Sequence, residues 1–398
     1  MIKKIRIDNF KSLNDFSMDL GKLTVVIGDN AVGKSSLLQA LVFLRYSCTS
    51  LVDQYLKDRS VSVDSIVSKI QPISKRTMSF EVTFDFDGEI VLWKIAFLSE
   101  KKTNSIKLQT ESVELCPDCN KPVVLLHYSS SKAFRHHQDS DTDESIPVAS
   151  YSCSQLQFID EKAARSFPCL WRIRKFFMDS EPLDLLSPQD MRRSARGNAR
   201  TLGINGSRLP ALINQLNEKE RDNLVALIRS DLPNICSIQS IVHGKPGWAH
   251  LETIERFGTR DMKIPASGIS DGTLRLIALY SLGYIDKNSG MTLLDEVEDG
   301  INTNNLENVI KTLKDYVDNR NQQVLVTTHS TVMLDYCNPS DIRYMYRDDR
   351  GNTVCRTFNE PEMIKEKLEY LYPGELILNL DTCELNQLMA ESKSDYGA

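Results

Sequence analysis

The sequence predicts an α/β fold built around a strand, a glycine-rich loop and a helix. Three observations lead to this prediction. Residues 23–27 read LTVVI and are almost entirely apolar, residues 28–35 read GDNAVGKS, and apolar side chains recur at helical spacing over residues 35–45. Two further strands with apolar centres, residues 292–294 and 322–327, each lead into polar residues. We therefore expect one layer of mixed sheet that cradles the loop.

The length and composition allow a large folded protein. The 398 residues suffice for two domains, or for one large domain with an elaborated insertion. With 41% hydrophobic residues, the chain can bury a core without disulfides or metal ions. The net charge of -6 argues against a surface that binds nucleic acid over its whole extent, but it leaves room for a local basic patch.

No targeting or membrane segment is expected. The start, MIKKIRIDNF, is not followed by an apolar run of signal-peptide length, and no stretch approaches the roughly 18 apolar residues of a membrane span. The nine cysteines are an odd number and are scattered, which fits free thiols in a reducing cytosol. We expect a cytoplasmic protein with no membrane partner.

Five segments are expected along the chain. Two strands precede the loop, and a hairpin over 78–98 turns at Asp87-Gly88. A hairpin near 349–352 closes the second half of the core. The expected segments are the first half of the core with its antiparallel strands at 1–98, a polar, irregular and variable insertion at 99–155, a helical lobe at 156–255, the second half of the core at 256–357, and a helical tail at 358–398.

Residues 28–35 match the phosphate-loop pattern G-x-x-x-x-G-K-[ST] between a strand and a helix. Gly28 and Gly33 let the backbone bend so that successive N–H groups face phosphates, and the new helix adds a partial positive charge. Lys34 would reach the β- and γ-phosphates of ATP, and the Ser35 hydroxyl would bind Mg²⁺. A chance glycine-rich turn is the alternative. The residues assigned to nucleotide binding here are Gly28, Asp29, Asn30, Ala31, Val32, Gly33, Lys34, Ser35 and Ser36.

Acidic residues follow the apolar strand at 292–294. A P-loop enzyme needs a carboxylate there to hold Mg²⁺, and Asp295 fits that role. Hydrolysis also needs a group that orients and deprotonates the attacking water, and Glu296 is the candidate base. The alternative for this pair is a solvated acidic turn. Glu298 and Asp299 either line a seam between subunits or face water.

A histidine follows the apolar strand at 322–327, in the run VLVTTHS. At that place His329 can contact the γ-phosphate and sense its loss, whereas the alternative is a purely structural histidine. The catalytic candidates are therefore Lys34, Glu296 and His329.

A Ser/Gly loop opens an amphipathic helix at 267–283, in the run SGISDGTLRLIALYSLG. The Ser270 hydroxyl and the backbone N–H groups near Gly272 would form an anion site at a helix N-terminus. Because the chain already has one phosphate loop, a second anion site makes sense if it closes over the nucleotide of a partner subunit. The alternative is an ordinary helix start with Ser270 as its N-cap.

These four motifs, in this order, resemble those of the ABC-type ATPases of the RecF, SMC and OLD-like branch. The opening IRIDNFKSLNDFSMDLGKLTVVIGDNAVGKSSLL resembles the start of that branch. ISDGT resembles its variant of the LSGGQ signature, with Asp271 and Thr273 replacing a glycine and the glutamine. DEVEDGIN is similar to its Walker B motif and TTHS to its switch motif. The runs NGSRLPALINQL and YLYPGELILNLDTCEL resemble compact bacterial AAA-type ATP-binding domain proteins, so the likeness covers nearly the whole chain except roughly 99–155.

The resemblance implies an ABC-ATPase head with a mixed sheet, an antiparallel β subdomain and a helical lobe. Two heads would pack head to tail, as a dimer or within a higher homo-oligomer, with ATP and Mg²⁺ between the phosphate loop of one and the signature loop of the other. Hydrolysis of ATP would then act as a switch. No long coiled coil separates the motif halves, and too few residues follow His329 for the TOPRIM nuclease domain of OLD proteins.

Three uses of such a switch compete. The resemblance favours the regulatory or sensor ATPase of a bacterial antiphage defence system that works with a separate effector protein such as a nuclease, by fold-level analogy. The alternative is a RecF-like DNA repair or maintenance ATPase, which would bind nucleic acid. A transporter subunit is disfavoured because its signature would be closer to LSGGQ.

Cys116 and Cys119 form a single C-x-x-C pair. A structural zinc needs four ligands, and the downstream candidates are irregularly spaced, so a loop with free thiols is the default. The downstream candidates are His127, His136, His137 and Cys153.

Residues 191–208 carry five arginines, whose forked side chains suit phosphate, an acidic partner or the nucleotide of a neighbouring subunit. A solvated mobile loop is the alternative. Few aromatic residues are interleaved, which disfavours a stacking platform for single strands. The arginines are Arg192, Arg193, Arg196, Arg200 and Arg208.

Overall fold

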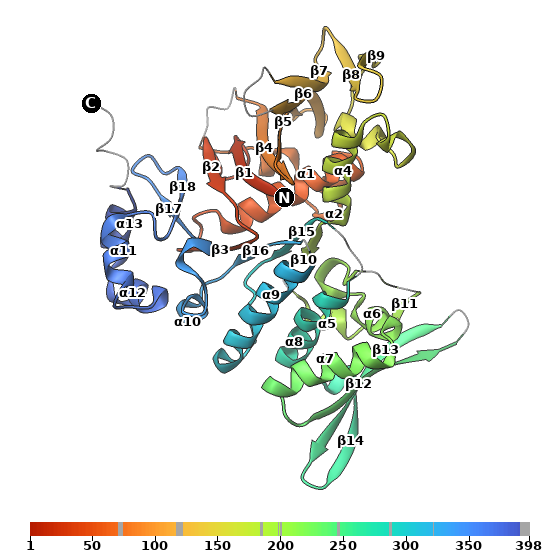
Figure 1. The fold of residues 1–398 in the computed structure, drawn as a ribbon, viewed down its shortest axis with the longest axis vertical. Helices are drawn as coiled ribbons and strands as arrows, with labels where there is room; N and C mark the ends of the chain where they lie inside the picture. The colour runs from red at the N-terminus through yellow and green to blue at the C-terminus, as the bar shows by residue number, and fades with distance from the viewer. Residues whose placement is uncertain are drawn as a thin grey trace. The chain divides into compact units, whose positions relative to one another are not determined.

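The computed structural model describes residues 1–70, 75–116, 122–183, 186–197, 199, 201–244, 247–285, 289–320 and 322–390 (Figure 1). The chain divides into two compact units. The first unit comprises Met1–Ser180 and Arg343–Glu360, and the second comprises Glu181–Ile342 and Pro361–Ala398. The chain therefore returns to the first unit with a short segment before its tail.

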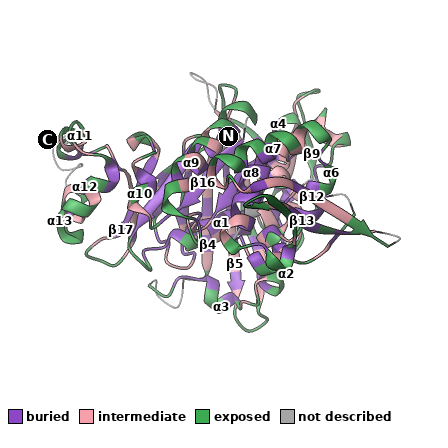
Figure 2. Ribbon diagram, turned by 90° about the horizontal axis from the view of Figure 1, so that it is seen from below, coloured by how far each residue is buried: buried purple, intermediate pink, exposed green. Residues whose placement is uncertain are grey.

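The first unit contains an antiparallel sheet in the order β2-β1-β4-β5-β6-β7-β8-β9. Residues alternate between buried and partly exposed along β4 and β5, as expected for a sheet with one face against a core (Figure 2). The hairpin predicted over 78–98 is confirmed, and both residues of its Asp87-Gly88 turn have positive φ. The strands are β1 (Ile2–Asp8), β2 (Phe16–Asp19), β4 (Thr77–Phe86), β5 (Glu89–Glu100), β6 (Ser105–Cys116), β7 (Val123–Tyr128), β8 (Ala133–His137) and β9 (Thr142–Ser145).

The prediction of irregular backbone over 99–155 is wrong, because β6, β7, β8 and β9 extend the sheet there. The pattern is hard to see in the sequence for two reasons. β6 pairs with β5 through a register shift beside Ala96 and Phe97, which interrupts the alternation of apolar and polar residues. β9 is exposed along its whole length and so carries no apolar signal. In addition, the short β2 is a third strand before the glycine-rich loop, where the sequence predicts two.

Helices of the first unit pack on this sheet through aromatic rings. The ring of Phe43 on α1 lies 5.5 Å from Phe10 and 5.5 Å from Phe80. Phe177 on α4 lies 5.4 Å from Trp93 of β5. Such ring contacts add to the burial of apolar area and fix where each helix sits. The helices are α1 (Lys34–Thr49), α2 (Val52–Asp58), α3 (Val63–Ile66) and α4 (Pro168–Asp179), with 3₁₀ turns at Gln155–Phe158 and Lys162–Ala164.

A second group of strands in the first unit follows the order β3-β17-β18. β3 (Leu23–Gly28) is buried along its whole length and leads into the glycine-rich loop. β17 (Ile342–Arg347) and β18 (Thr353–Thr357) form an antiparallel hairpin, which confirms the predicted closing hairpin. The β17–β18 hairpin therefore lies beside β3, the strand that leads into the glycine-rich loop.

The second unit contains three parallel strands, β10 (Glu181–Leu183), β15 (Met291–Leu294) and β16 (Gln323–Thr327). β15 and β16 are buried throughout, and their sequences, MTLL and QVLVT, are mostly apolar, as is usual for parallel strands. The helix predicted after residue 268 is confirmed as α8 (Asp271–Ser281). The other helices here are α5 (Pro188–Met191), α6 (Leu209–Gln215), α7 (Glu218–Asp231), α9 (Leu306–Arg320) and α10 (Thr331–Leu334), with 3₁₀ turns at Ile204–Gly206, Ala266–Gly268, Leu282–Tyr284, Thr303–Asn305 and Pro339–Asp341.

The helical lobe predicted over 156–255 is only partly helical. α4, α6 and α7 lie within that range, but so does most of a small antiparallel sheet in the order β11-β13-β12. β11 precedes α6, β12 and β13 follow α7, and β14 pairs with β13. Charged residues on the exposed face mask its alternating pattern in the sequence. Only Ala249, Leu251 and Thr253 of β13 are fully buried. The strands are β11 (Ala195–Arg196), β12 (Ile235–His243), β13 (Trp248–Phe257) and β14 (Arg260–Pro265).

The helical tail is confirmed over the described residues, as α11 (Glu362–Leu368), α12 (Pro373–Asn379) and α13 (Thr382–Ala390). α12 packs on α10, where a Cβ on Gly374 would lie 2.1 Å from the Thr331 carbonyl oxygen. In the part of the chain that the structure describes, no helix combines the length and the apolar character needed to cross a membrane. The eight cysteines within that part are all free thiols, and Cys119 lies outside it.

Candidate active site

The glycine-rich loop links β3 to α1, and its two glycines are required by close contacts. A Cβ on Gly28 would lie 2.1 Å from the carbonyl oxygen of Met345 in β17. Gly33 has φ +114°, and a Cβ there would lie 2.6 Å from the Ser12 hydroxyl. Ala31 also has a positive φ, of 62°. The loop therefore takes a conformation that larger residues at positions 28 and 33 would block.

The side chain of Lys34 folds back over the loop. It is buried, and its Nζ donates hydrogen bonds to the carbonyl oxygens of Gly28 at 2.7 Å and Asp29 at 2.9 Å. Ser35, on the first turn of α1, is exposed, whereas Ser36 accepts a 3.1 Å hydrogen bond from the Ser12 hydroxyl. Of the other loop residues assigned from the sequence, Asp29, Asn30 and Ala31 are exposed and Val32 is buried.

Two side chains of the β17–β18 hairpin hold the loop, and sequence reasoning does not find them. Arg347 Nη2 donates to the Ala31 carbonyl at 2.9 Å, and Thr353 Oγ1 donates to the Val32 carbonyl at 2.7 Å. The hairpin therefore helps to fix the loop backbone. No sequence signal reveals a contact between residues more than 300 positions apart.

In the second unit, Asp295 and Glu296 follow β15 and meet the end of β16. The Thr327 hydroxyl donates to Asp295 Oδ1 at 2.5 Å and accepts a 2.9 Å hydrogen bond from the Glu296 backbone N–H. Glu296 has φ +47°, a conformation that costs free energy for a residue other than glycine and that is common at functional sites. A single hydroxyl therefore fixes both carboxylate residues, and the sequence does not point to Thr327.

His329 lies beside the acidic pair. Its Nε2 is 3.5 Å from Glu296 Oε1, and its backbone N–H donates to Glu298 Oε1 at 2.5 Å. The side chains of His329 and Glu296 are each about two-fifths exposed, at 37% and 43%. The structure thus brings Asp295, Glu296 and His329 together, and it gives Glu298 a partner in the histidine loop.

Ser270 is the N-cap of α8. Its hydroxyl oxygen accepts a 3.2 Å hydrogen bond from the Thr273 backbone N–H and donates to Thr273 Oγ1 at 2.8 Å. The capping role considered from the sequence is therefore present, and the serine is also exposed. Arg192 holds the loop in place through a 2.7 Å hydrogen bond to the Ile269 carbonyl and a 2.6 Å ion pair with Asp271.

The signature helix is tied to the loop after the acidic pair. A Cβ on Gly272 would lie 2.5 Å from the Gly300 carbonyl oxygen, so this glycine is needed for close packing. The buried guanidinium of Arg275 contacts the Asp299 carboxylate at 2.7 Å, and it donates to the carbonyl oxygens of Asp299 and Leu186. The signature helix and the loop after the acidic pair are therefore in direct contact.

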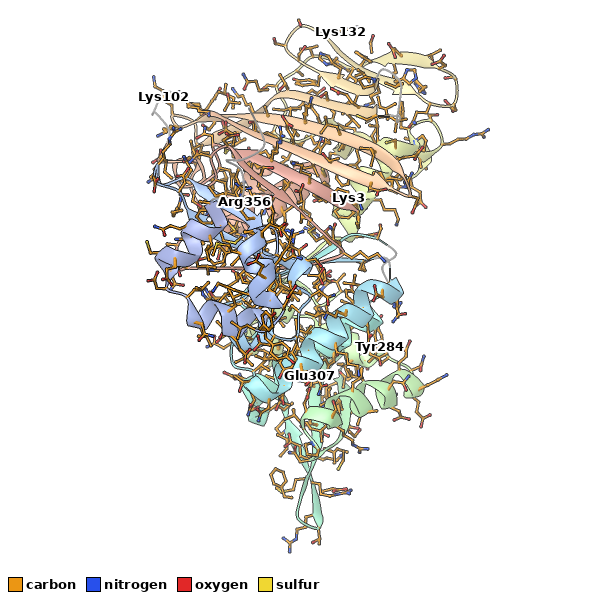
Figure 3. All side chains as sticks on the ribbon, turned by 60° about the vertical axis from the view of Figure 1, so that its left-hand side comes forward. Lys3, Lys102, Lys132, Tyr284, Glu307 and Arg356 are labelled. Carbon is orange, nitrogen blue, oxygen red and sulfur yellow. The ribbon has the colours of Figure 1, made fainter. Side chains whose placement is uncertain are left out.

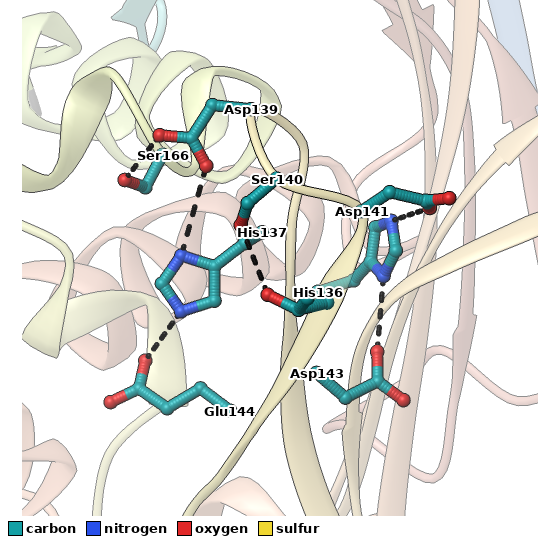
Figure 4. Close-up of polar contacts among 9 residues, drawn as sticks. His136, His137, Asp139, Ser140, Asp141, Asp143, Glu144 and Ser166 are labelled. Carbon is teal, nitrogen blue, oxygen red and sulfur yellow. Dashed lines mark hydrogen bonds and ion pairs between the residues drawn. The ribbon is translucent and has the colours of Figure 1, made fainter.

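Two of the histidines considered for zinc, His136 and His137, have acidic partners (Figure 4). His136 pairs with Asp141 at 3.3 Å and with Asp143 at 3.0 Å. His137 lies 3.9 Å from Asp139 and 3.6 Å from Glu144. His127 stacks on Phe134, and Cys153 is buried. Among the described residues, no group of three or more His, Cys, Asp or Glu side chains could hold a metal ion, and Cys119 lies outside these residues.

Comparison with protein families gives one match that spans most of the chain. The family described as "AAA domain, putative AbiEii toxin, Type IV TA system" matches residues 23–335. A protein of Helicobacter pylori (strain ATCC 700392 / 26695) named "ATP/GTP phosphatase" is 21% identical over 401 aligned positions, which cover 94% of this chain and 99% of that protein.

Solved structures show a related fold. The Smc head bound to the C-terminal winged-helix domain of ScpA is 16% identical with a TM-score of 0.55, covering 92% of this chain and 99% of that one. The Smc head with an extended coiled coil, bound to the C-terminal domain of ScpA derived from Pyrococcus furiosus, is 13% identical with a TM-score of 0.53 and the same coverage. These likenesses show that the chain has the ABC-ATPase head fold predicted from its motifs.

Proposed function

The chain belongs to the P-loop ATPase family of AAA domains described as putative AbiEii toxins of type IV toxin–antitoxin systems, and from this premise we propose that two copies share each ATP site. Lys34 and the loop N–H groups of one copy bind the phosphates. Ser270 and the backbone N–H groups near Gly272 of the other copy cap the γ-phosphate from outside. The exposure of Ser270 supports this, because an exposed serine at a helix N-terminus can be reached by the nucleotide of another copy.

The proposed donors for Mg²⁺ are the hydroxyl of Ser35 and the carboxylate of Asp295. Magnesium prefers hard oxygen ligands, and Thr327 holds the Asp295 carboxylate in one orientation. When bound, the ion would neutralise charge on the β- and γ-phosphates. The site residues themselves do the rest of the chemistry.

In the proposed reaction, Glu296 acts as general base. Its carboxylate takes a proton from a water molecule as the water oxygen attacks the γ-phosphorus, and ADP leaves as the bond to its β-phosphate oxygen breaks. His329, 3.5 Å from Glu296, orients the carboxylate and contacts the γ-phosphate. The observation that carries the proposal is the single hydroxyl of Thr327, which positions Asp295 and Glu296 together beside His329.

The test is Glu296→Gln. The variant should keep ATP binding, lose at least about a hundredfold in turnover, and accumulate as an ATP-bound dimer, because general bases contribute roughly 10²–10⁴ in rate. Glu307→Gln is the matched control, since Glu307 is an exposed glutamate on α9 (Figure 3). Turnover, nucleotide binding and sedimentation report the three properties. Normal turnover in Glu296→Gln would reject the assigned base.

We also propose how the switch is used. The family description points to toxin–antitoxin systems, and this supports a regulatory or sensor ATPase in a cytoplasmic antiphage defence system. A separately encoded effector protein would read the closed and open states. Copurification of the native protein with the product of a neighbouring gene, in the presence of ATP but not ADP, tests this use.

A further inference from the structure

One face of the small sheet in the second unit gathers aromatic and cationic side chains. Arg196 of β11 pairs in register with Trp248 of β13, and Trp248 pairs with His243 of β12. His250 lies two residues further along β13 and on the same face, because side chains alternate along a strand. All four are exposed, and we call them the stacking face.

The rings of the stacking face are held in defined positions. The Arg196 guanidinium lies 5.1 Å from the centroid of the Trp248 ring, within the range of a cation–π contact. The rings of His243 and His250 are 5.3 Å apart, edge to face. The opposite side of β13 is buried through Ala249 and Leu251, and β12 and β13 pack on α6. The stacking face is therefore supported by strands that pack on a helix.

Acidic side chains of the same small sheet are already paired. Glu252 accepts a 2.6 Å hydrogen bond from Gln239 and lies 3.9 Å from Lys263. Asp261 forms a two-pronged pair with Arg256, at 2.8 and 3.1 Å. Within the described residues, no carboxylate lies within ion-pair distance of Arg196. The guanidinium of Arg196 is thus available to bind an anionic ligand.

Another cation–π pair in the chain has a guanidinium whose charge is already paired with carboxylates. In the first unit, Arg172 lies 4.5 Å from the centroid of the Phe86 ring. There the guanidinium is neutralised by Asp87 at 3.0 Å and Glu89 at 2.7 Å. Both pairs lie within cation–π distance, but only Arg172 has carboxylate partners, so Arg172 and Phe86 serve as an internal comparison.

We propose that the stacking face binds single-stranded nucleic acid. Bases would stack on Trp248 and on the two histidine rings, since every base has a flat π face, and Arg196 would bind a backbone phosphate. Single strands fit this face better than duplexes because only unpaired bases expose their flat surfaces. Arg196 belongs to the arginine-rich segment 191–208, and β12 and β13 supply the rings that this segment lacks in the linear sequence. The proposal is independent of how the ATP site is shared.

The experiment measures fluorescence anisotropy of a labelled oligothymidylate of about 20 nucleotides, longer than one small-domain site. With the full chain, Trp248→Ala and Arg196→Ala should each weaken binding about fivefold or more, the lower end of the effect of losing one base–aromatic stack. Trp248→Phe should keep most of the affinity. Phe86→Ala and Arg172→Ala, the matched controls, should bind like the unaltered chain. ATP turnover without nucleic acid checks that each variant is folded.

Three results would overturn the proposal. The first is unchanged affinity in both Trp248→Ala and Arg196→Ala. The second is a duplex of the same length that binds as tightly as the single strand, which would indicate a purely electrostatic surface. The third is displacement of the oligonucleotide by an equal concentration of an acidic peptide, which would indicate a protein partner instead.

Discussion

At the scale of single residues, Glu111 is a carboxyl group buried in the core of the first unit. It accepts hydrogen bonds from Trp93 Nε1 at 2.8 Å, from the Gln155 backbone N–H at 2.7 Å, and from the Ser154 hydroxyl. Burial outweighs these hydrogen bonds and raises the pKa of Glu111 to about 7. The side chain therefore titrates in the folded protein near neutral pH.

This raised pKa predicts how stability depends on pH. Below the ordinary glutamate pKa of about 4.5, both the folded and the unfolded chain are protonated at this position. Between about 4.5 and 7 only the unfolded chain releases the proton, so the free energy of unfolding falls as pH rises. The loss over that window is on the order of 3 kcal/mol. Glu111→Gln should remove this decline, as measured by denaturant unfolding at a series of pH values.

Glu114→Gln is the matched control, because Glu114 lies on the same strand and is only partly buried. It should leave the pH dependence of unfolding as it is in the unaltered chain. A Glu111→Gln profile that parallels the unaltered profile between about pH 5 and 7 would show that the Glu111 carboxyl does not hold its proton in the folded state.

At the scale of elements, the start of α8 depends on close packing against the loop after the acidic pair. Gly272→Ala should lower the free energy of unfolding by about 1–3 kcal/mol, because the added Cβ would lie 2.5 Å from the Gly300 carbonyl oxygen and must push the two segments apart. Gly283→Ala is the matched control, since no atom lies within 4 Å of a Cβ there. Thermal and denaturant unfolding measure both. Equal stability of the two variants would mean that the packing can relax at no cost.

The phosphate loop and the acidic strand could be predicted from the sequence because each depends on residues that are adjacent in the chain. Gly28, Gly33 and Lys34 act through local backbone geometry, and the pattern at 28–35 fixes that geometry. The side chains that hold these site residues in place could not be predicted in this way, because they come from distant parts of the chain. Thr353 reaches the loop from 321 residues away, and the buried Arg275 reaches Leu186 from 89 residues away. Such contacts leave no periodic signal in one sequence.

The stacking face likewise could not be predicted from the sequence, because it depends on which strands pair. The arginine-rich segment 191–208 has few aromatic residues, so the sequence disfavours a platform for single strands. Pairing in the sheet places Trp248 beside Arg196, although 52 positions separate them in the chain. Strand pairing of this kind is decided by tertiary packing, and charged residues on the exposed side hide the alternation that predicts a strand.

At the scale of the whole molecule, the proposed sharing of each ATP site between two copies predicts that two inactive variants can restore turnover when they pair. Lys34→Ala should abolish turnover because both sites of its dimer lack the phosphate-binding lysine. Ser270→Arg should also abolish it, because both sites lack a working cap while the loop still binds ATP. In a mixed dimer of the two variants, one site combines the intact Lys34 of one copy with the intact Ser270 of the other.

Turnover should therefore reappear when the two inactive proteins are mixed. Random pairing at equal amounts gives one intact site in half of the dimers, so about a quarter of the unaltered rate should return. In the matched control, Lys34→Ala is mixed with the double variant Lys34→Ala/Ser270→Arg. No dimer in that mixture has an intact site, because every copy lacks Lys34. Recovery in the first mixture but not in the control can arise only if Lys34 and Ser270 act on one nucleotide from different copies. If mixed dimers form without recovery, each site must be complete within a single copy.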